Sequence, residues 1–226
     1  YLDGRCVDKA NCATWEAGQR LLINRSVEAA VFENGAEMIL RDGLAYDRCQ
    51  VGVVTDADGV EALSEFYVEN DQQLYNVLRT QVDVVLSDGV AVLNAADARL
   101  LPMMDLCDGE VILYDADPAS NVLHPHIDIG GRAVYARDGR LIIASGKNEV
   151  VLANLTAFSC LTHPTQPLSL ETLLAGVGAA WALGLSHHLI VAGLITFSLE
   201  DSTSELQPAQ PLTSRSSSHA RKQANA

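Results

Sequence analysis

Basic residues are scarce in this 226-residue chain. Its 15 lysines and arginines stand against 29 aspartates and glutamates, which gives a formal net charge of −14. A surface of this sign repels phosphate backbones and anionic lipid headgroups. The shortage of positive charge therefore argues against nucleic acids and membrane surfaces as partners, and we interpret the acidic excess as a solubilising surface.

Paired cysteines and uninterrupted apolar runs are also missing. The five cysteines are odd in number and scattered, without a Cys-X-X-Cys pair: Cys6, Cys12, Cys49, Cys107 and Cys160. This spacing argues against a disulfide framework and a zinc site, and is typical of reduced thiols in a cytoplasmic protein. The apolar stretch 173–199 is broken by Gly184, Ser186 and two histidines, so it is too polar for a membrane span. No signal peptide is recognisable, and we expect a cytoplasmic location.

What the chain does have is an alternation of short apolar runs with helical segments. The patterns predict strands at 27–32, 51–54, 90–93 and 111–114, helices at 13–24, 72–85 and 100–106, and a helical turn at 37–40. Short connections between such elements require right-handed crossovers, so the predicted fold is α/β, a mostly parallel sheet flanked by helices. Segment 1–7 is predicted to be an edge strand or half of a hairpin.

The second half of the chain carries a different signal. Two apolar runs at 132–136 and 141–145 flank Asp138-Gly139, which predicts a small β-hairpin, continued by a strand at 150–153. Helices are expected at 169–183 and 186–197, because each begins at a serine that can cap it. Beyond Glu200 the composition turns to Ser, Gln, Pro and Ala. We therefore expect a domain at 1–199 and a disordered tail at 200–226.

Several segments carry a resemblance to one family. They are Val-Glu-Ala-Ala-Val-Phe-Glu at 27–33, Gly-Leu-Ala-Tyr-Asp-Arg-Cys at 43–49, Val-Gly-Val-Val at 51–54, and Gly-Val-Ala-Val-Leu-Asn-Ala-Ala-Asp at 89–97. From residue 8 to 197 the chain resembles the Mur ligase-like module of cyanophycin synthetases, ATP-dependent amide ligases that build an aspartate–arginine polymer. The resemblance implies a fold like the Mur ligase central domain, with ATP and Mg²⁺ as cofactors. It also implies two partners, the remainder of a synthetase chain with its ATP-grasp domain and further copies in a homo-oligomer.

Three residues fall on family positions that hold these cofactors. The resemblance makes Glu33 a ligand of Mg²⁺ and places Asn94 and Asp97 where the family contacts the nucleotide. From the residues alone, Glu33 is a solvated carboxylate at a strand end, and Asn94 and Asp97 are suitable caps for the following helix. The sequence favours these plainer roles and leaves the cofactor roles open.

Other family positions carry unsuitable residues. The phosphate-binding loop Gly-X₄-Gly-Lys-Ser/Thr does not occur in the chain, and in the family it lies just upstream of the position of Tyr1. Four more departures follow: the family's threonine pair falls on Cys12 and Ala13, its glycine pair on Glu37 and Met38, its Asn…Asp-His segment on 56–60, and its lysine on Arg79, which cannot be carbamoylated.

Two further pairs of polar residues suggest sites of their own. Asp56 and Asp58 are spaced for acid–base work or an ion site, but a loop that ends on Gly59 favours an Asx turn. His124 and His126 flank a proline, but they have no third ligand nearby in the sequence, which argues against a metal site.

These losses favour the reduced, dipeptide-polymerising type of cyanophycin synthetase, with this module vestigial and structural and without a catalytic residue. The chain opens on Tyr1 without a methionine and is therefore expected to be a fragment. Two alternatives stay open. One is an active acid–amino acid ligase domain, dependent on ATP and Mg²⁺, whose phosphate loop lies upstream of residue 1. The other is an α/β binding module unrelated to ligases.

Overall fold

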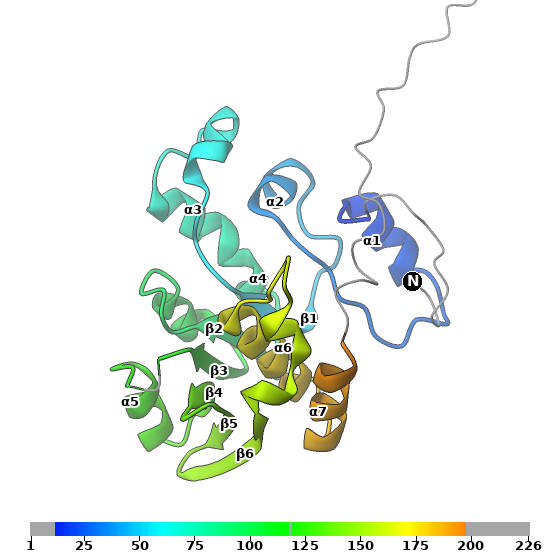
Figure 1. Cartoon of the computed structure of the whole chain (residues 1–226). Helices are drawn as coiled ribbons and strands as arrows, with labels where there is room; N and C mark the ends of the chain where they lie inside the picture. Colours follow the sequence, from blue (N-terminus) through cyan, green and yellow to red (C-terminus); the bar gives the residue numbers. More distant parts are fainter. Residues whose placement is uncertain (1–11, 118, 198–226) are drawn as a thin grey trace, which may run out of the picture.

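The computed structural model describes residues 12–117 and 119–197. In these ranges six strands form one sheet in the order of the sequence (Figure 1). They are β1 (Cys49–Val54), β2 (Val85–Asn94), β3 (Glu110–Asp115), β4 (Arg132–Arg137), β5 (Arg140–Ser145) and β6 (Asn148–Asn154). Strands β1 to β4 pair in parallel, whereas β5 and β6 are antiparallel. The prediction of an α/β fold with a mostly parallel sheet and a small hairpin is confirmed; its likeness to the Mur ligase central domain stays a prediction.

The predicted helices are present with shifted ends, whereas α5, η1, η3 and η4 below were not predicted. The α-helices are α1 (Trp15–Leu22), α2 (Ala36–Asp42), α3 (Asp71–Leu78), α4 (Thr80–Asp83), α5 (Leu123–Asp128), α6 (Leu170–Ala182) and α7 (His187–Thr196). The 3-10 helices are η1 (Val60–Phe66), η2 (Leu101–Leu106), η3 (Leu155–Ala157) and η4 (Ser159–Thr162). The predicted helix 72–85 is divided into α3 and α4, and β2 already begins at its last residue. Segment 100–106 forms a 3-10 helix.

The serine caps of the last two helices are confirmed. Ser169 Oγ accepts a hydrogen bond from Thr172 N at 3.1 Å, and Ser186 Oγ accepts one from Leu189 N at 3.4 Å. Each cap satisfies a backbone donor that the first turn of a helix leaves unpaired. No helix of the described ranges has the length and apolar character that a membrane span requires.

Both faces of the sheet are covered, which explains the near-continuous apolar runs of its central strands. Helix α6 lies on one face, where Leu173, Leu174 and Val177 belong to the same buried cluster as Val92 of β2. Gly178 permits the close approach, because a Cβ there would lie 2.7 Å from Val92 Cγ1. Helices α3, α4, α5, η1 and η2 cover the opposite face. The central strands are therefore buried on both faces, and the loops that follow them begin from this packed core.

The predicted strand at 27–32 is wrong. None of these residues forms a strand, and Val31 is 92% exposed. Within the described residues β1 pairs only with β2, and segment 27–32 does not add to its open edge. Apolar residues form a strand only where another strand pairs with them and a face is covered, and the segment has neither. It follows α1 as a loop before α2 (Figure 1).

Two other predictions concern residues that the structure does not describe. Most of the N-terminal segment, at 1–11, and the tail from 198 onward lie outside the described ranges. The strand at 1–7, the disordered tail at 200–226 and the domain limit at 199 therefore stay predictions.

Candidate ligand site at the carboxyl edge of the sheet

The carboxyl ends of β1 and β2 lie side by side, with Val54 opposite Leu93. We call this end of the two strands, with the loops 55–59 and 94–99 that follow them, the carboxyl edge. Ligands of open α/β sheets bind outside this edge, because the loops leave a crevice there. A pocket of about 410 Å³ opens beside it, lined by residues 32–36, by 53–56 and Asp58, and by Leu78 and Gln81. The carboxyl edge is therefore the candidate site.

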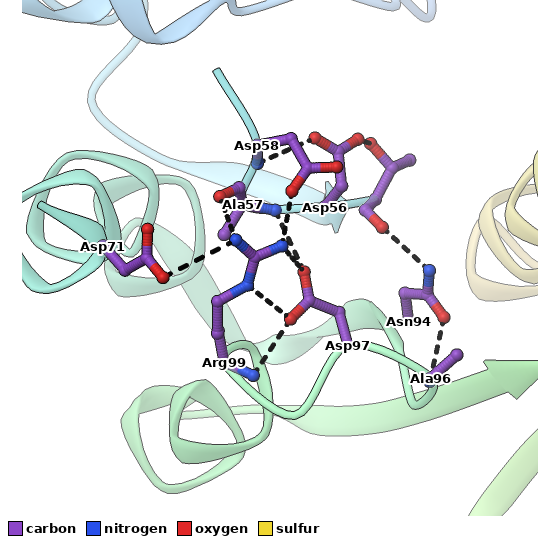
Figure 2. Close-up of polar contacts among 9 residues, drawn as sticks. Asp56, Ala57, Asp58, Asp71, Asn94, Ala96, Asp97 and Arg99 are labelled. Atoms are coloured by element: carbon purple, nitrogen blue, oxygen red, sulfur yellow. Dashed lines mark hydrogen bonds and ion pairs between the residues drawn. The ribbon is translucent and has the colours of Figure 1, made fainter. Parts of the chain in front are cut away.

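Asn94 joins the two loops of the carboxyl edge (Figure 2). Its Nδ2 donates to the carbonyl oxygen of Thr55 at 2.9 Å, and its Oδ1 accepts from Ala96 N at 3.0 Å. Both ends of the amide are thus bonded to the protein backbone. The predicted helix cap is wrong, since Leu100 holds the N-cap position of η2, without a side-chain hydrogen bond, and Asn94 closes a local turn instead. The resemblance implies that Asn94 contacts the nucleotide. In the structure its polar atoms instead bond to the backbone of the two loops.

Asp97 receives four hydrogen bonds, two at each carboxylate oxygen. Oδ1 accepts from Arg99 N at 3.0 Å and Arg99 Nε at 2.8 Å, while Oδ2 accepts from Arg99 Nη2 at 2.7 Å and Ala57 N at 3.1 Å. The side chain is only 12% exposed. The hydrogen bonds from Arg99 hold the pKa of Asp97 below its usual value, against the opposing effect of burial. Asp97 is therefore an ionised group that the protein itself saturates, and it does not cap a helix.

Arg99 is the central residue of the carboxyl edge, and the sequence analysis did not find it. Besides Asp97, its guanidinium donates to the carbonyl oxygen of Ala57 at 2.7 Å and to Asp58 at 2.6 Å, and it lies 3.9 Å from Asp71 (Figure 2). Its pKa is raised, chiefly by the hydrogen bonds to Asp97 and Asp58. The available signal was its position two residues after a predicted site carboxylate in a chain with few basic residues.

The loop after β1 forms the Asx turn that the sequence predicts. Asp58 N donates to Asp56 Oδ1 at 3.2 Å, and the hydroxyl of Thr55 donates to Asp56 Oδ2 at 2.8 Å. Gly59 then takes a left-handed conformation with φ of +91°, which glycine adopts without strain. The acidic pair thus shapes the loop.

Glu33 lies apart from Asn94 and Asp97. It is exposed and lines the pocket of the carboxyl edge, but no strand ends at it. Its neighbour Asn34 is anchored, because Nδ2 donates to Tyr46 Oη at 2.8 Å and to Gln81 Oε1 at 3.4 Å. The described residues contain no group of three His, Cys, Asp or Glu side chains that is arranged for a metal. Glu33 as a Mg²⁺ ligand therefore stays a prediction.

A second pocket, of about 390 Å³, brings together positions that the resemblance placed near phosphate. Cys12, Ala13, Glu33 and Met38 all line it, along with residues of α1 and of the loop 27–34. Among the described residues that line either pocket there is no lysine or arginine. A triphosphate needs positive charge and bound Mg²⁺ to offset its own charge. These residues therefore do not fit ATP, and no catalytic step through it can be derived from them.

The chain is similar to three cyanophycin synthetases from different organisms. It is 29% identical over 197 residues to the cyanophycin synthetase of Synechocystis sp., 29% identical over 198 residues to that of Crocosphaera subtropica, and 28% identical over 197 residues to that of Trichormus variabilis. In each case the similarity covers 87% of this chain and 22% of the relative. No model of a protein family matches the chain. The chain is thus a homologue of cyanophycin synthetases that spans about a fifth of their length.

Proposed function

We propose that this chain is part of an ATP-dependent amide ligase of the cyanophycin synthetase type, and that it serves there as a structural module without catalysis of its own. The similarity to cyanophycin synthetases over 87% of the chain supports the ligase as a whole. The substitutions at the phosphate and metal positions support the reduced, dipeptide-polymerising type with a Mur ligase-like module.

One observation carries the structural role. The polar groups of the carboxyl edge are bonded to one another: Asn94 to backbone atoms of both loops, Asp97 to Arg99 and Ala57, and Asp58 to Arg99. A ligand would have to break these bonds before it could form its own, and it would gain no positive charge from the lining residues. The cost of leaving such polar groups unpaired is about 1–3 kcal/mol each. The carboxyl edge is therefore better suited to holding loops than to binding a nucleotide.

A module without chemistry of its own contributes through contacts with other parts of the enzyme. Helix α7 carries no aspartate, glutamate, lysine or arginine, and Leu189 and Ile195 on it are 61% and 52% exposed. Exposed apolar side chains on a helix without acidic or basic residues are compatible with an interaction surface. Because the relatives are much longer than this chain, we assign the α7 surface to the remainder of the synthetase, of which the ATP-grasp domain is part.

An activity measurement tests this proposal. The purified chain is incubated with MgATP, aspartate, arginine and the aspartate–arginine dipeptide, and ADP release is recorded. We expect no release above the rate without enzyme. Release that depends on an amino acid acceptor and disappears in Glu33→Gln would refute the structural role.

The active-ligase alternative has one observation in its favour, which is that Glu33 lines the pocket beside the carboxyl edge. It requires a phosphate loop upstream of residue 1. Reading the open reading frame before Tyr1 decides between the two, because a glycine-rich loop with a lysine there favours the ligase. An α/β module unrelated to ligases is disfavoured by the similarity over 87% of the chain.

A further inference from the structure

We propose that the open edge of β6 is a dimerisation edge, at which β6 of a second copy of this chain pairs in the antiparallel sense. The pairing joins two six-stranded sheets into one continuous sheet. This inference goes beyond the proposed structural role, because it concerns a surface other than that of α7 and does not depend on whether the chain binds a nucleotide.

Strand β6 is the last strand of the sheet, and within the described residues it pairs only with β5 (Figure 1). The N–H and C=O groups on the outer side of such a strand are a template for one more strand. Proteins that keep an edge free often place a proline or a lysine in it. The sequence of β6, Asn-Glu-Val-Val-Leu-Ala-Asn, contains neither. The edge therefore lacks two common protections against pairing.

The single charged residue of β6 is turned away from the edge. The carboxylate of Glu149 reaches across β5 to β4, where it accepts hydrogen bonds from Tyr135 Oη at 2.6 Å and from Arg137 Nη1 at 3.1 Å. The hydrogen bonds from Arg137 and Tyr135 hold the pKa of Glu149 below its usual value. Its negative charge is thus offset within the molecule and does not repel a strand that approaches the edge.

Two exposed valines occupy the middle of β6. Val150 lies opposite Ile143 of β5 and is 40% exposed. Val151 lies opposite Ile142 and is 52% exposed. The two isoleucines belong to the buried clusters on opposite faces of the sheet, so the two valines lie on opposite faces as well. A further strand would therefore cover an apolar side chain on each face, and β-branched side chains stabilise such cross-strand pairs.

The charge of this part of the molecule favours a second copy as the partner. The segment 132–154, which holds β4, β5 and β6, contains four arginines or lysines and two acidic residues, a local net charge of +2. The whole chain has a net charge of −14, so its copies repel each other where acidic surfaces meet. The β6 end of the sheet avoids this repulsion, and its positive charge is attracted by the acidic remainder of the other copy.

The residues of β6 favour one register. Opposite residues of antiparallel strands lie on the same face, so two copies related by a twofold axis pair with one residue opposite itself. A register centred on Glu149 sets two carboxylates against each other. A register centred on Val151 brings Leu152, a bulged residue without a partner on β5, into the middle of the pair. The register centred on Val150 avoids both.

The test is the self-association of the full chain, measured by sedimentation velocity over a series of concentrations. We expect a monomer of 24.2 kDa in equilibrium with a dimer of twice that mass. The Kd should be roughly 10–100 µM, because a single pair of edge strands is smaller than a standard interface. Hydrogen exchange should show that the amides of β6 become better protected as the concentration rises, whereas those of β2 do not change.

Position 150 lies on the twofold axis in this register, which permits a charge-swap experiment. Val150→Lys sets two lysines against each other and Val150→Glu sets two carboxylates, so each variant alone should dimerise at least about tenfold more weakly than the wild type. An equimolar mixture should regain the dimer, because a lysine then lies opposite a glutamate, and this recovery shows that both variants fold. Val31→Lys is the matched control, because Val31 is also an exposed valine but lies in the loop before α2. It should dimerise like the wild type.

A wild type that stays monomeric at about ten times the expected Kd would overturn the inference and leave the edge of β6 to the remainder of the synthetase. A dimer that neither Val150→Lys nor Val150→Glu weakens, or that their mixture does not restore, would also overturn it. In the first of these cases, loss of the dimer in Leu189→Glu would place the contact on α7.

Discussion

Two regions of this molecule have similar apolar sequences and different structures. The run Val-Ala-Val-Leu of β2 has a parallel strand on each side, and both Val92 and Leu93 are 0% exposed. The run 27–32, with Val31 at 92% exposed, pairs with no strand among the described residues. The difference shows that a buried strand is made by its neighbours and by the layers above and below it. An apolar run without them is only a candidate strand.

The largest expected effect comes from truncating one aliphatic side chain to alanine in each of the two regions. Leu93→Ala should lower the free energy of unfolding by about 2–5 kcal/mol, because it leaves a cavity between covered layers. Val31→Ala should change it by less than about 0.5 kcal/mol, because the side chain is already in water. Urea denaturation followed by circular dichroism measures both. A large loss for Val31→Ala would mean that the 27–32 segment packs against something.

Glycine substitutions probe the same contrast at the level of the backbone. A Cβ at Gly109, just before β3, would lie 2.2 Å from the carbonyl oxygen of Gly89 in β2. Gly109→Ala should therefore cost about 1–3 kcal/mol through forced backbone shifts. Gly35→Ala is the control, since a Cβ there meets nothing within 4 Å, and it should cost less than about 1 kcal/mol. Similar melting temperatures for the two variants would contradict the packing of β2 against the start of β3.

Helix caps provide a smaller and more local comparison. Ser169→Ala removes the cap of α6, which covers the sheet, and should lower global stability by about 1 kcal/mol. Thr14 caps α1 in the same way, through a hydrogen bond from Ala17 N at 3.3 Å. No residue of α1 belongs to the two buried clusters that pack on the sheet. Thr14→Ala should therefore mainly increase fraying of α1. Hydrogen exchange separates the outcomes, and a global loss of protection in Thr14→Ala would contradict this account.

The pH dependence of stability gives the smallest expected effect. The pKa of Asp97 is lowered in the folded protein, so its contribution is present above the unfolded pKa of about 3.9 and is lost as the pH falls through the lower folded pKa. Stability should therefore decline as the solution becomes more acidic than about pH 4 to 5. Asp97→Asn should show a shallower decline in urea unfolding measured at several pH values. Ser169→Ala is the control, because it lowers stability without changing a titrating group, and an identical slope in Asp97→Asn would rule out this coupling.

Much of the fold follows from local pattern. The strands β2 and β3 are dense in valine, isoleucine and leucine, Asp138-Gly139 marks the hairpin, and serine caps mark α6 and α7. The missing strand at 27–32 could not be foreseen, because strand pairing is decided by residues that are distant in sequence. The division of the predicted helix 72–85 and the early start of β2 also depend on how the chain packs against the sheet.

The candidate site was predicted only in part. Asn94 and Asp97 were singled out through the resemblance; their predicted role as helix caps is wrong, and their nucleotide contact stays a prediction. The hydrogen bonds of Arg99 to Asp58 and to the carbonyl oxygen of Ala57 were not predicted, because these residues lie 41 and 42 positions away in the sequence. Periodic patterns in a sequence indicate local secondary structure and do not reveal contacts between residues so far apart. The bonds from Arg99 to Asp58 and Ala57 were therefore visible only once the loops after β1 and β2 were placed side by side.

Calorimetric titration of the full chain with ATP in the presence of Mg²⁺ tests the central claim most directly. The account predicts no saturable heat up to about 1 mM nucleotide, because the polar groups of the carboxyl edge are bonded to one another and the pockets contain no positive charge. Saturable binding in the micromolar range, dependent on Mg²⁺ and lost in Asn94→Ala, would contradict it.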